Sequence, residues 1–194
     1  MNEIFSLFPT PVAILPDFIS EEERLELLKM IEDIPRYKHG SIDGDGYSTY
    51  DMGFYDEVAT NFVNDTIKER VQEVVDGFTE MTGDVDASLA DFWFNVQNSG
   101  SKLCEHTHAQ SIISGALYIN VDETCKLYFH NPNPYTHFVA SKTSTSFNYQ
   151  NQWIPVKNCQ MVLFPSWLKH GNNREVNTMD NRIVISFNTL PIRQ

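Results

Sequence analysis

The spacing of hydrophobic residues divides the chain into an N-terminal part with helical periodicity and a C-terminal part with alternating periodicity. Ser20 and Glu23 form a capping-box sequence, and the apolar residues after them recur at helical spacing until Pro35. A second helix is predicted from about Glu57 to Met81, and Gly83 is expected to end it. The apolar stripe of this second helix is typical of a helix that packs on a protein core.

Downstream of Asp84 the pattern changes to short segments rich in β-branched and aromatic residues, separated by residues that favour turns. We expect strands near residues 90–97, 113–121, 126–129, 160–164 and 182–190. Helices first and short strands afterwards predict a mainly β fold, a sandwich or jelly roll with the N-terminal helices packed on one sheet. We expect one domain over residues 1–194, with 1–83 as helical support and 84–194 as the jelly-roll core.

Three further segments follow neither periodicity. Residues 5–18 are apolar but interrupted by prolines, which favours an extended segment at a sheet edge. Residues 38–53 are predicted as a loop, in which residues 43–46 form a pair of turns, since the later acidic ligands of a calcium loop are missing. Residues 131–158 are too polar for core and too aromatic for disorder. They are predicted as a partly ordered hairpin or lid beside the functional site, and a plain surface hairpin is an equally good interpretation.

The composition excludes some classes of partner. The chain of 194 residues has 26 acidic and 14 basic residues, and its formal charge is −12. Because lysines and arginines form no cluster, neither a nucleic acid nor an anionic membrane is expected as a partner. We expect no signal peptide and no membrane span, and a cytoplasmic protein whose three cysteines stay reduced. Oligomeric state cannot be predicted from these features.

Two histidines separated by one residue, His106 and His108, precede an apolar segment with strand periodicity. In an extended segment alternate side chains share a face, so these imidazoles are expected to converge while Glu105 and Thr107 take the opposite face. Two converging imidazoles make a poor core and suit a divalent metal ion. Cys104, just before them, is expected to be a small buried residue and no ligand.

A third histidine, His170, follows another apolar segment and precedes a predicted strand that begins with Arg182. A metal site with oxygen chemistry is the function that we expect of these residues together. A lone histidine is more often a hydrogen-bonded structural residue than a ligand. We therefore expect structural roles for His39, His130 and His137.

Four segments in the second half of the chain carry a family resemblance when taken in order. They are His106-Thr107-His108, Ser114-Gly115-Ala116-Leu117-Tyr118, Phe164-Pro165-Ser166-Trp167-Leu168-Lys169-His170 and Arg182-Ile183-Val184-Ile185-Ser186-Phe187-Asn188. Together with Phe8-Pro9-Thr10-Pro11-Val12 they resemble the Fe(II)- and 2-oxoglutarate-dependent oxygenases, in a subgroup related to prolyl hydroxylases. The resemblance implies a double-stranded β-helix in which a His-x-Asp pair and a distant histidine hold iron.

The resemblance also assigns roles to individual residues. His106 takes the position of the first metal ligand and His170 that of the distal ligand. Arg182 takes the position that anchors the far carboxylate of 2-oxoglutarate, a task for which its planar guanidinium is suited. Tyr118 falls where related enzymes place a tyrosine that bonds the same carboxylate, while Val184 replaces the serine that commonly accompanies the arginine.

Two alternating polar residues, Asn95 and Gln97, lie on the predicted strand before the histidine pair. Strand alternation gives these two side chains the same face, so they are expected to line the pocket.

The main departure from the family pattern is His108, which stands where the family usually has aspartate. A third neutral imidazole would preserve the three-ligand face and leave the site one unit more positive. Alternatively, His106 and His170 hold the metal with water, and His108 lies outside the ligand set. Glu105 and Asp122 are the carboxylates that could supply another ligand, although strand alternation points Glu105 away.

The reaction implied by the resemblance is hydroxylation of a C–H bond coupled to decarboxylation of 2-oxoglutarate to succinate, with molecular oxygen as oxidant. The expected substrate is a small molecule or peptide, including a peptidyl or free amino acid. A cupin-like metal protein is the first alternative, but its pattern requires a glutamate that residues 109–113 lack. A non-catalytic jelly-roll binding module is the second, and it predicts no bound metal.

Overall fold

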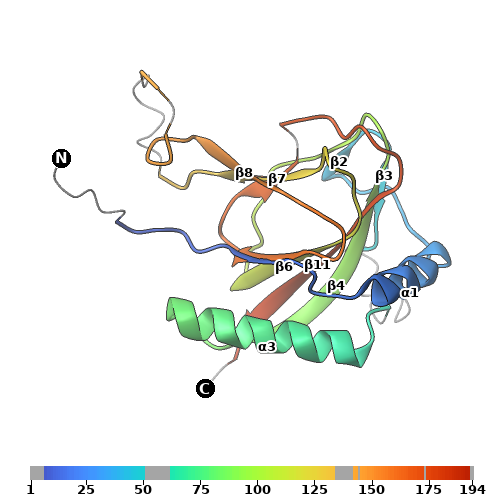
Figure 1. Cartoon of the computed structure of the whole chain (residues 1–194), viewed down its shortest axis with the longest axis horizontal. Helices are drawn as coiled ribbons and strands as arrows, with labels where there is room; N and C mark the ends of the chain where they lie inside the picture. The colour runs from blue at the N-terminus through green and yellow to red at the C-terminus, as the bar shows by residue number, and fades with distance from the viewer. Residues whose placement is uncertain (1–6, 51–61, 134–141, 144, 173, 193–194) are drawn as a thin grey trace.

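A computed structural model describes residues 7–50, 62–133, 142–143, 145–172 and 174–192 (Figure 1). Strands predominate, with two helices among the described elements. The elements in chain order are β1 (Ala13–Leu15), α1 (Glu21–Glu32), β2 (Ile42–Asp43), β3 (Gly46–Ser48), α3 (Asp65–Thr82), β4 (Ala87–Gln97), β5 (Lys102–Leu103), β6 (Ile113–Asn120), β7 (Lys126–His130), β8 (Asn151–Pro155), β9 (Met161–Pro165), β10 (His170–Gly171) and β11 (Arg182–Pro191). Within these residues neither helix is long and apolar enough to cross a lipid bilayer.

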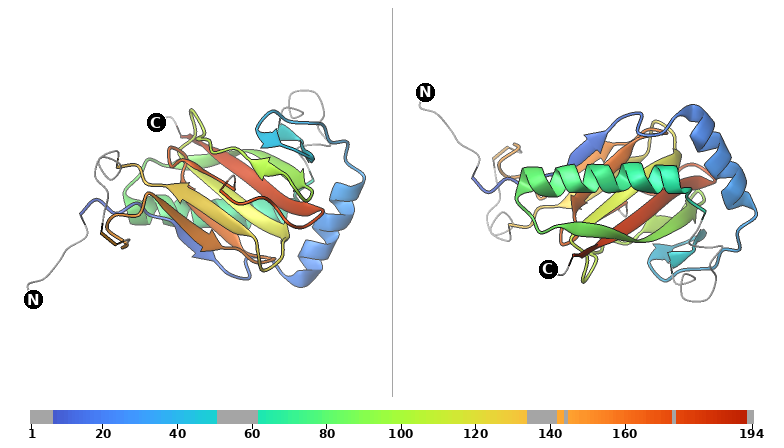
Figure 2. Two further views of the ribbon diagram at one scale, coloured as in Figure 1. Left: turned by 90° about the horizontal axis from the view of Figure 1, so that it is seen from above. Right: turned by 90° about the horizontal axis from the view of Figure 1, so that it is seen from below.

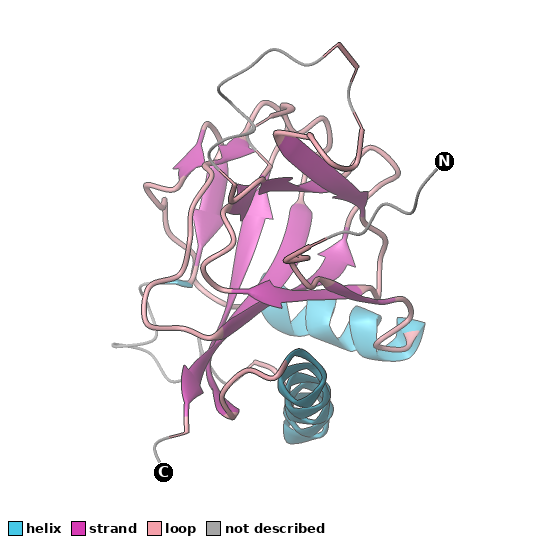
Figure 3. Ribbon diagram, turned by 90° about the vertical axis from the view of Figure 1, so that its left-hand side faces the viewer, coloured by secondary structure: helices cyan, strands magenta, loops and turns pink. Residues whose placement is uncertain are grey.

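The strands form two main antiparallel sheets. The major sheet has six strands in the order β1-β9-β6-β11-β4-β3, and the minor sheet has three in the order β10-β7-β8. The minor sheet lies over one face of the major sheet, and α3 runs beneath the other face (Figures 1 and 3). Buried residues of β6, β7, β9 and β11 form one hydrophobic cluster between the two sheets. The described chain therefore forms a sandwich of two sheets, with α3 outside the larger sheet.

Helix α1 begins at the predicted capping box. The Ser20 hydroxyl accepts a hydrogen bond from the Glu23 N–H at 3.1 Å, and the Glu23 carboxylate accepts one from the Ser20 N–H at 2.8 Å. These bonds satisfy two backbone donors that a helix start leaves unpaired. Leu27 and Ile31 of this helix are buried in the core, and the helix ends just before Pro35 as predicted.

Helix α3 begins later than predicted. The predicted start near residue 57 lies outside the described residues, and the helix itself begins at Asp65. Asn64 caps it, because its side-chain oxygen accepts a hydrogen bond from a backbone N–H three residues on, at 2.9 Å. Phe62 and Val63 fall within the predicted helix, but they precede the observed one and are nonetheless buried. The apolar spacing continues on the N-terminal side of the Asn64 cap, so it predicts a longer helix than the one that forms.

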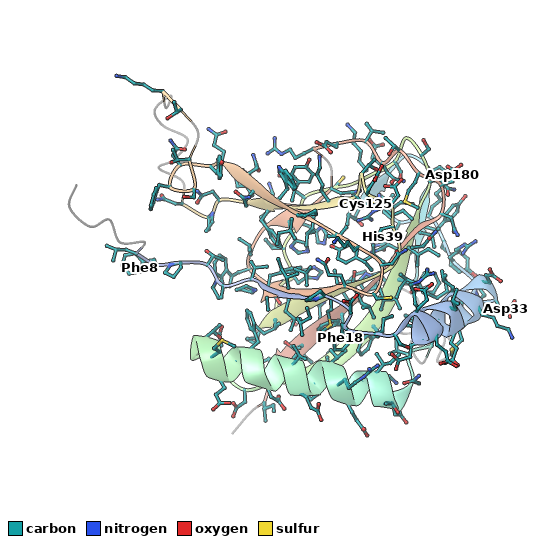
Figure 4. All side chains as sticks on the ribbon, viewed as in Figure 1. Phe8, Phe18, Asp33, His39, Cys125 and Asp180 are labelled. Carbon is teal, nitrogen blue, oxygen red and sulfur yellow. The ribbon has the colours of Figure 1, made fainter. Side chains whose placement is uncertain are left out.

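The other end of α3 and its packing follow the sequence pattern. Gly83 ends the helix in a left-handed conformation with φ of 71°, which glycine adopts without strain. Val71, Val75 and Phe78 are buried in the cluster that also holds residues of β4 and β11. Seen from below, α3 lies across the major sheet (Figure 2). Side chains fill the space between helix and sheet, whereas Phe8 lies outside on the N-terminal extension (Figure 4).

Strand alternation divides the major sheet into a face toward the helices and a face toward the minor sheet. On β4, Phe94 and Val96 belong to the core beneath the sheet, whereas Asn95 and Gln97 face a cavity between the sheets. The paired strand β11 alternates in the same way, with Arg182 opposite Gln97. The period-2 pattern thus gives the sheet one apolar face and one polar face.

The structure corrects one prediction about an irregular segment and confirms another. The predicted loop 38–53 contains β2 and β3, of which β3 extends the major sheet and β2 pairs with β5. The chain bends between these strands at Gly44, whose φ is 88°. Residues 51–53 lie outside the described residues. The extended edge segment predicted within 5–18 is confirmed by β1, which is an edge strand of the major sheet.

The stretch 131–158 contains one more strand. β8 pairs with β7 throughout its length and completes the minor sheet. Trp153 on β8 is exposed and lies 5.0 Å from the ammonium of Lys126, measured to the ring centroid. Residues 134–141 and 144 lie outside the described residues, and so does His137. The described part of the stretch forms a hairpin with β7, and a role as a lid stays a prediction.

Candidate metal centre

Two of the predicted ligands face each other across a backbone bridge. The N–H of His106 donates to the carbonyl of His170 at 2.9 Å, and the reverse bond is 3.0 Å. The centroids of the two imidazole rings are 4.5 Å apart. Because His170 also starts β10, the minor sheet positions this pair of side chains.

His108 completes a group of three histidines. Its N–H donates to the carbonyl of Ser166 at 3.0 Å, and its ring stacks on that of His170 with centroids 5.1 Å apart. The Nε2 atoms of His108 and His170 are 3.2 Å apart, and one ligand nitrogen from each histidine lies within 4.8 Å of the others. Two nitrogens bound at right angles to one ion, each at about 2.1 Å, are about 3 Å apart. The spacing therefore suits one metal ion.

Backbone carbonyls orient two of the three imidazoles. The Nδ1 of His106 lies 2.8 Å from the carbonyl of Cys104, and the Nδ1 of His170 lies 2.8 Å from the carbonyl of Leu168. Each Nδ1 must carry the proton to donate to a carbonyl, which leaves the Nε2 lone pair free. Both rings are thus held in the tautomer that binds a metal through Nε2.

Burial keeps the three histidines neutral. Burial first, and then the neighbouring His106, lowers the pKa of His108 to about 4 and that of His170 to about 3. The pKa of His106 is also lowered, mainly by burial. Neutral imidazole is the form that binds metal ions, so no proton has to be displaced at neutral pH.

The histidines open onto a cavity of about 410 Å³ between the two sheets. All the site residues predicted from the sequence line it, namely Asn95, Gln97, His106, His108, Tyr118, His170 and Arg182. Thr107 also lines it, so alternation along the histidine segment is less regular than predicted. No carboxylate is among the described residues that line the cavity, and Arg182 is the permanent charge there. A cavity of this size can hold a small molecule.

Arg182 and its neighbours form one polar end of the cavity. Arg182 is 5% exposed, and its guanidinium donates to the side-chain oxygen of Gln97 at 2.6 Å. No described carboxylate pairs with this guanidinium. Tyr118 is also buried, which raises the pKa of its phenol and keeps the hydroxyl protonated. Within the described chain no hydrogen bond forms to the Tyr118 hydroxyl or the Asn95 amide, so these polar groups are open to a ligand.

Further cavity residues were missed by the sequence analysis. Trp93 lies beside His108, with ring centroids 5.7 Å apart, and Ser186 and Asn188 lie on the same face of β11 as Arg182. The sequence does contain a signal for Ser186 and Asn188, because strand alternation puts every second residue after Arg182 on the same face. Serine and asparagine are too common on strands to attract notice without that register.

Glu105 points away from the histidines, as predicted. Its carboxylate pairs with Lys169 at 3.1 Å and with Arg174 at 3.0 Å. Because Glu105 precedes His106 and Lys169 precedes His170, the first ion pair ties together the two segments that carry these histidines. Glu105 is therefore occupied by ion pairs on the opposite side of the bridge.

The remaining candidates lie outside the histidine group. Cys104 is exposed, so its prediction as a buried residue is wrong; its carbonyl holds His106. Asp122 accepts hydrogen bonds from Thr124 in the turn after β6. His39 lines the rim of the cavity, whereas His130 does not line it and contacts a side chain of β8.

Comparison with solved structures finds the same fold in proteins of low sequence identity that bind or depend on 2-oxoglutarate. HygX from Streptomyces hygroscopicus, solved with nickel, 2-oxoglutarate and hygromycin B, has a TM-score of 0.61 and 13% identity over 94% of this chain and 83% of its own. The epimerase SnoN from nogalamycin biosynthesis has 0.62 and 12%, over 94% and 77%. The viral collagen prolyl hydroxylase of Paramecium Bursaria Chlorella virus-1 has 0.56 and 12%, over 92% and 96%. This chain therefore has the jelly-roll fold of these proteins.

Sequence comparison places the chain in a family. No curated protein sequence matches it. The model of the family described as "Putative 2OG-Fe(II) oxygenase" matches residues 91–188, which is half of the chain and includes all three histidines and Arg182. This protein belongs to the 2-oxoglutarate- and Fe(II)-dependent oxygenase family.

Proposed function

We propose that this protein is a dioxygenase that hydroxylates a C–H bond of a small substrate, such as a peptidyl or free amino acid. The observation that carries the proposal is the joint position of three neutral histidines and one buried arginine, with no described acid beside it, in a single cavity. The family supplies the cofactors, Fe(II) and 2-oxoglutarate. Hydroxylation and the substrate class go beyond family membership and rest on the resemblance to prolyl hydroxylases.

The proposed metal ligands are His106, His108 and His170. Their neutral state, the carbonyl acceptors of two Nδ1 atoms and the 3.2 Å separation of two Nε2 atoms all suit a divalent ion. Imidazole is a common ligand of Fe(II), and three ligands on one side of the ion leave positions open for co-substrate and oxygen. The alternative set, His106 and His170 with water, leaves unexplained why His108 stacks against His170.

The proposed 2-oxoglutarate site is the polar end of the cavity. Arg182 is buried and charged with no described acid beside it, and a carboxylate of the co-substrate would supply the missing anion. Tyr118 would donate its hydroxyl to the same carboxylate, since its raised pKa keeps the proton in place. Asn95 and Gln97 line the same cavity, and the side-chain oxygen of Gln97 holds the Arg182 guanidinium in place.

The cofactors supply the oxidation, and the protein supplies position and surroundings. When bound, Fe(II) and 2-oxoglutarate couple decarboxylation to succinate with transfer of one oxygen atom from molecular oxygen to a C–H bond. The three histidines would hold the ion, and Arg182 would bind and orient the far carboxylate of the keto acid. The buried sheet face around them keeps bulk water from the reacting groups.

Family membership disfavours the two alternatives from the sequence. A cupin-like protein would require no 2-oxoglutarate, and the buried Arg182 would then have no assigned anion. A non-catalytic module would have no use for three histidines held as metal-binding tautomers.

The test is an anaerobic titration of Fe(II)-loaded protein with 2-oxoglutarate, followed by the weak visible charge-transfer band of the chelate. We expect the band in the wild type. We expect His108→Ala to lose both the band and most of the iron, because a ligand has been removed. His130→Ala is the matched control, since His130 does not line the cavity.

Each alternative gives a different outcome in this titration. Bound iron without a band would point to the cupin-like protein, and no bound iron in the wild type would point to the non-catalytic module. A His108→Ala variant that keeps both iron and band would remove His108 from the ligand set.

A further inference from the structure

The cavity has a second polar end, opposite Arg182. Along β11 the residues on the cavity face are Arg182, Val184, Ser186 and Asn188. At about 3.4 Å per residue, the Cα of Asn188 lies about 20 Å along the strand from that of Arg182. A 2-oxoglutarate molecule anchored at Arg182 is shorter than this distance. Ser186 and Asn188 therefore border the part of the cavity that the co-substrate leaves free.

Asn188 is connected to the metal centre by a chain of hydrogen bonds. Its Oδ1 accepts a bond from the Ser114 hydroxyl at 2.8 Å, and that hydroxyl lies 2.7 Å from the hydroxyl of Ser166. The carbonyl of Ser166 accepts the N–H of His108 at 3.0 Å. The second polar end thus lies on the His108 side of the centre.

This chain of bonds also fixes which way the Asn188 amide points. Because Oδ1 is occupied by Ser114, the two N–H donors of Nδ2 are the groups left for a ligand. The residue is 8% exposed and lines the cavity, and no described group accepts from Nδ2. The Ser186 hydroxyl has no hydrogen-bond partner among the described residues either. Both groups are therefore open to the cavity, where a ligand with acceptor oxygens would pair with them.

The charge of the cavity specifies the ligand further. Fe(II) and Arg182 carry three positive charges together, and 2-oxoglutarate brings two negative ones. With His108 in the place of the usual aspartate, one positive charge stays uncompensated near the metal. No carboxylate among the described lining residues could balance it or attract a cationic group.

We propose that Asn188 and Ser186 bind a carboxylate of the substrate, on the side of the metal centre opposite Arg182. This inference rests on the proposed function and deepens it by naming the substrate class, a small carboxylic acid. Among the expected amino-acid substrates, the proposal favours those that place a free carboxylate in the cavity. It disfavours those that would place a cationic side chain there.

The test uses acetate, acetamide and methylammonium as probes of the Co(II)- and 2-oxoglutarate-loaded protein. Co(II) is paramagnetic, so it speeds the proton relaxation of a methyl group held nearby, and the Zn(II)-loaded protein gives the diamagnetic reference. In the wild type we expect acetate to be relaxed most, acetamide less and methylammonium least. Asn188→Leu should weaken acetate binding about tenfold or more, because a hydrogen bond to a charged group is lost.

Asn188→Asp is the sharper variant, because it keeps the size of the side chain and an acceptor for Ser114. It should exclude acetate and admit methylammonium. Equal acetate relaxation in wild type and both variants would overturn the proposal, and so would wild-type relaxation of acetamide or methylammonium as strong as that of acetate. The visible spectrum of the Co(II) complex with 2-oxoglutarate is recorded before any probe is added. If the wild type shows no spectral sign of this complex, the proposed function is contradicted. If the complex forms but acetate is not relaxed, only the carboxylate site is contradicted.

Discussion

At the scale of single residues, Arg182 is the side chain whose surroundings say most about function. An arginine that is 5% exposed and has only an amide oxygen as its described side-chain partner is an expensive arrangement, since buried charges are normally paired. Its guanidinium offers five donors in a rigid fork, of which Gln97 uses one. The remaining donors are available to a planar carboxylate.

Replacing Arg182 with lysine should separate charge from geometry. Lysine keeps the positive charge but loses the bidentate fork, so we expect 2-oxoglutarate to bind about 10- to 100-fold more weakly while the metal content stays unchanged. Calorimetric titration of the anaerobic Fe(II)-loaded protein measures the affinity, and elemental analysis measures the iron. An unchanged affinity would remove Arg182 from its proposed role. Lysine is preferred to alanine because alanine would also leave the Gln97 oxygen buried without a donor.

The sequence could identify these residues because each stands at a strand end or repeats on a strand face. Asn95, Gln97 and Arg182 line the cavity as alternation predicts. The sequence carries no signal for which side chains are exposed in the turn before the histidines. The prediction that Cys104 is buried is wrong for that reason. Its side chain is exposed because its backbone carbonyl turns inward to hold His106.

At the scale of elements, the bend between β2 and β3 is held to the end of β4 by Asp45. Its carboxylate accepts hydrogen bonds from Asn98 at 2.7 Å and Lys38 at 2.9 Å. These contacts lower the pKa of Asp45 to about 2, and the hydrogen bond from Asn98 has the largest effect. A carboxyl group with a folded-state pKa below its ordinary value stabilises the fold only while it is ionised.

Acid should therefore weaken this connection in a defined range. Asp45 contributes fully above about pH 4, and its contribution is lost as the pH falls from about 4 towards 2. We expect Asp45→Asn to be less stable than wild type at pH 7, with a difference that shrinks between pH 4 and 3. Urea unfolding of both proteins at these pH values measures it. A difference that stays constant down to pH 3, or that grows, would contradict the assigned pKa.

Long elements follow from the sequence and short ones do not. The capping box of α1 and Gly83 of α3 are local signals, and the structure confirms both. β2 and β3 have two and three residues, and they exist because distant partners, β5 and β4, pair with them. No local pattern encodes such a partner. The late start of α3 has a local signal, Asn64, but the apolar residues before it belong to the core without being helical.

At the scale of the whole molecule, the fold sets where chemistry occurs without setting which reaction results. Solved structures with this fold and 12% identity include an epimerase and a prolyl hydroxylase. A shared fold therefore does not decide the reaction, which depends on the residues of each site. In this chain the distinctive features are His108 beside the other two histidines and a cavity whose described lining has no carboxylate, inside a protein of charge −12. Surface charge and cavity charge therefore have opposite signs.

The metal centre joins segments that are far apart in the chain, so metal binding should stabilise the whole fold. His106 and His108 precede β6, whereas His170 follows β9, and unfolding would separate them. A ligand that binds only the folded state at 100 times its Kd adds about 2.7 kcal/mol. For a domain of this size that corresponds to a Tm increase of about 5–11 °C. We expect such a shift with Ni(II) at neutral pH, measured by calorimetry, and its reversal by a chelator.

Variants separate this site-specific effect from binding of Ni(II) to the acidic surface. His106→Ala should abolish most of the increase, because two imidazoles bind a divalent ion far more weakly than three. His130→Ala should retain it, since His130 lies outside the cavity. A wild-type-like Tm increase in His130→Ala would also show that removing an arbitrary histidine does not abolish the effect of Ni(II). An equal Tm increase in His106→Ala and wild type would place the stabilising ion elsewhere and would leave the three histidines without a metal-binding role.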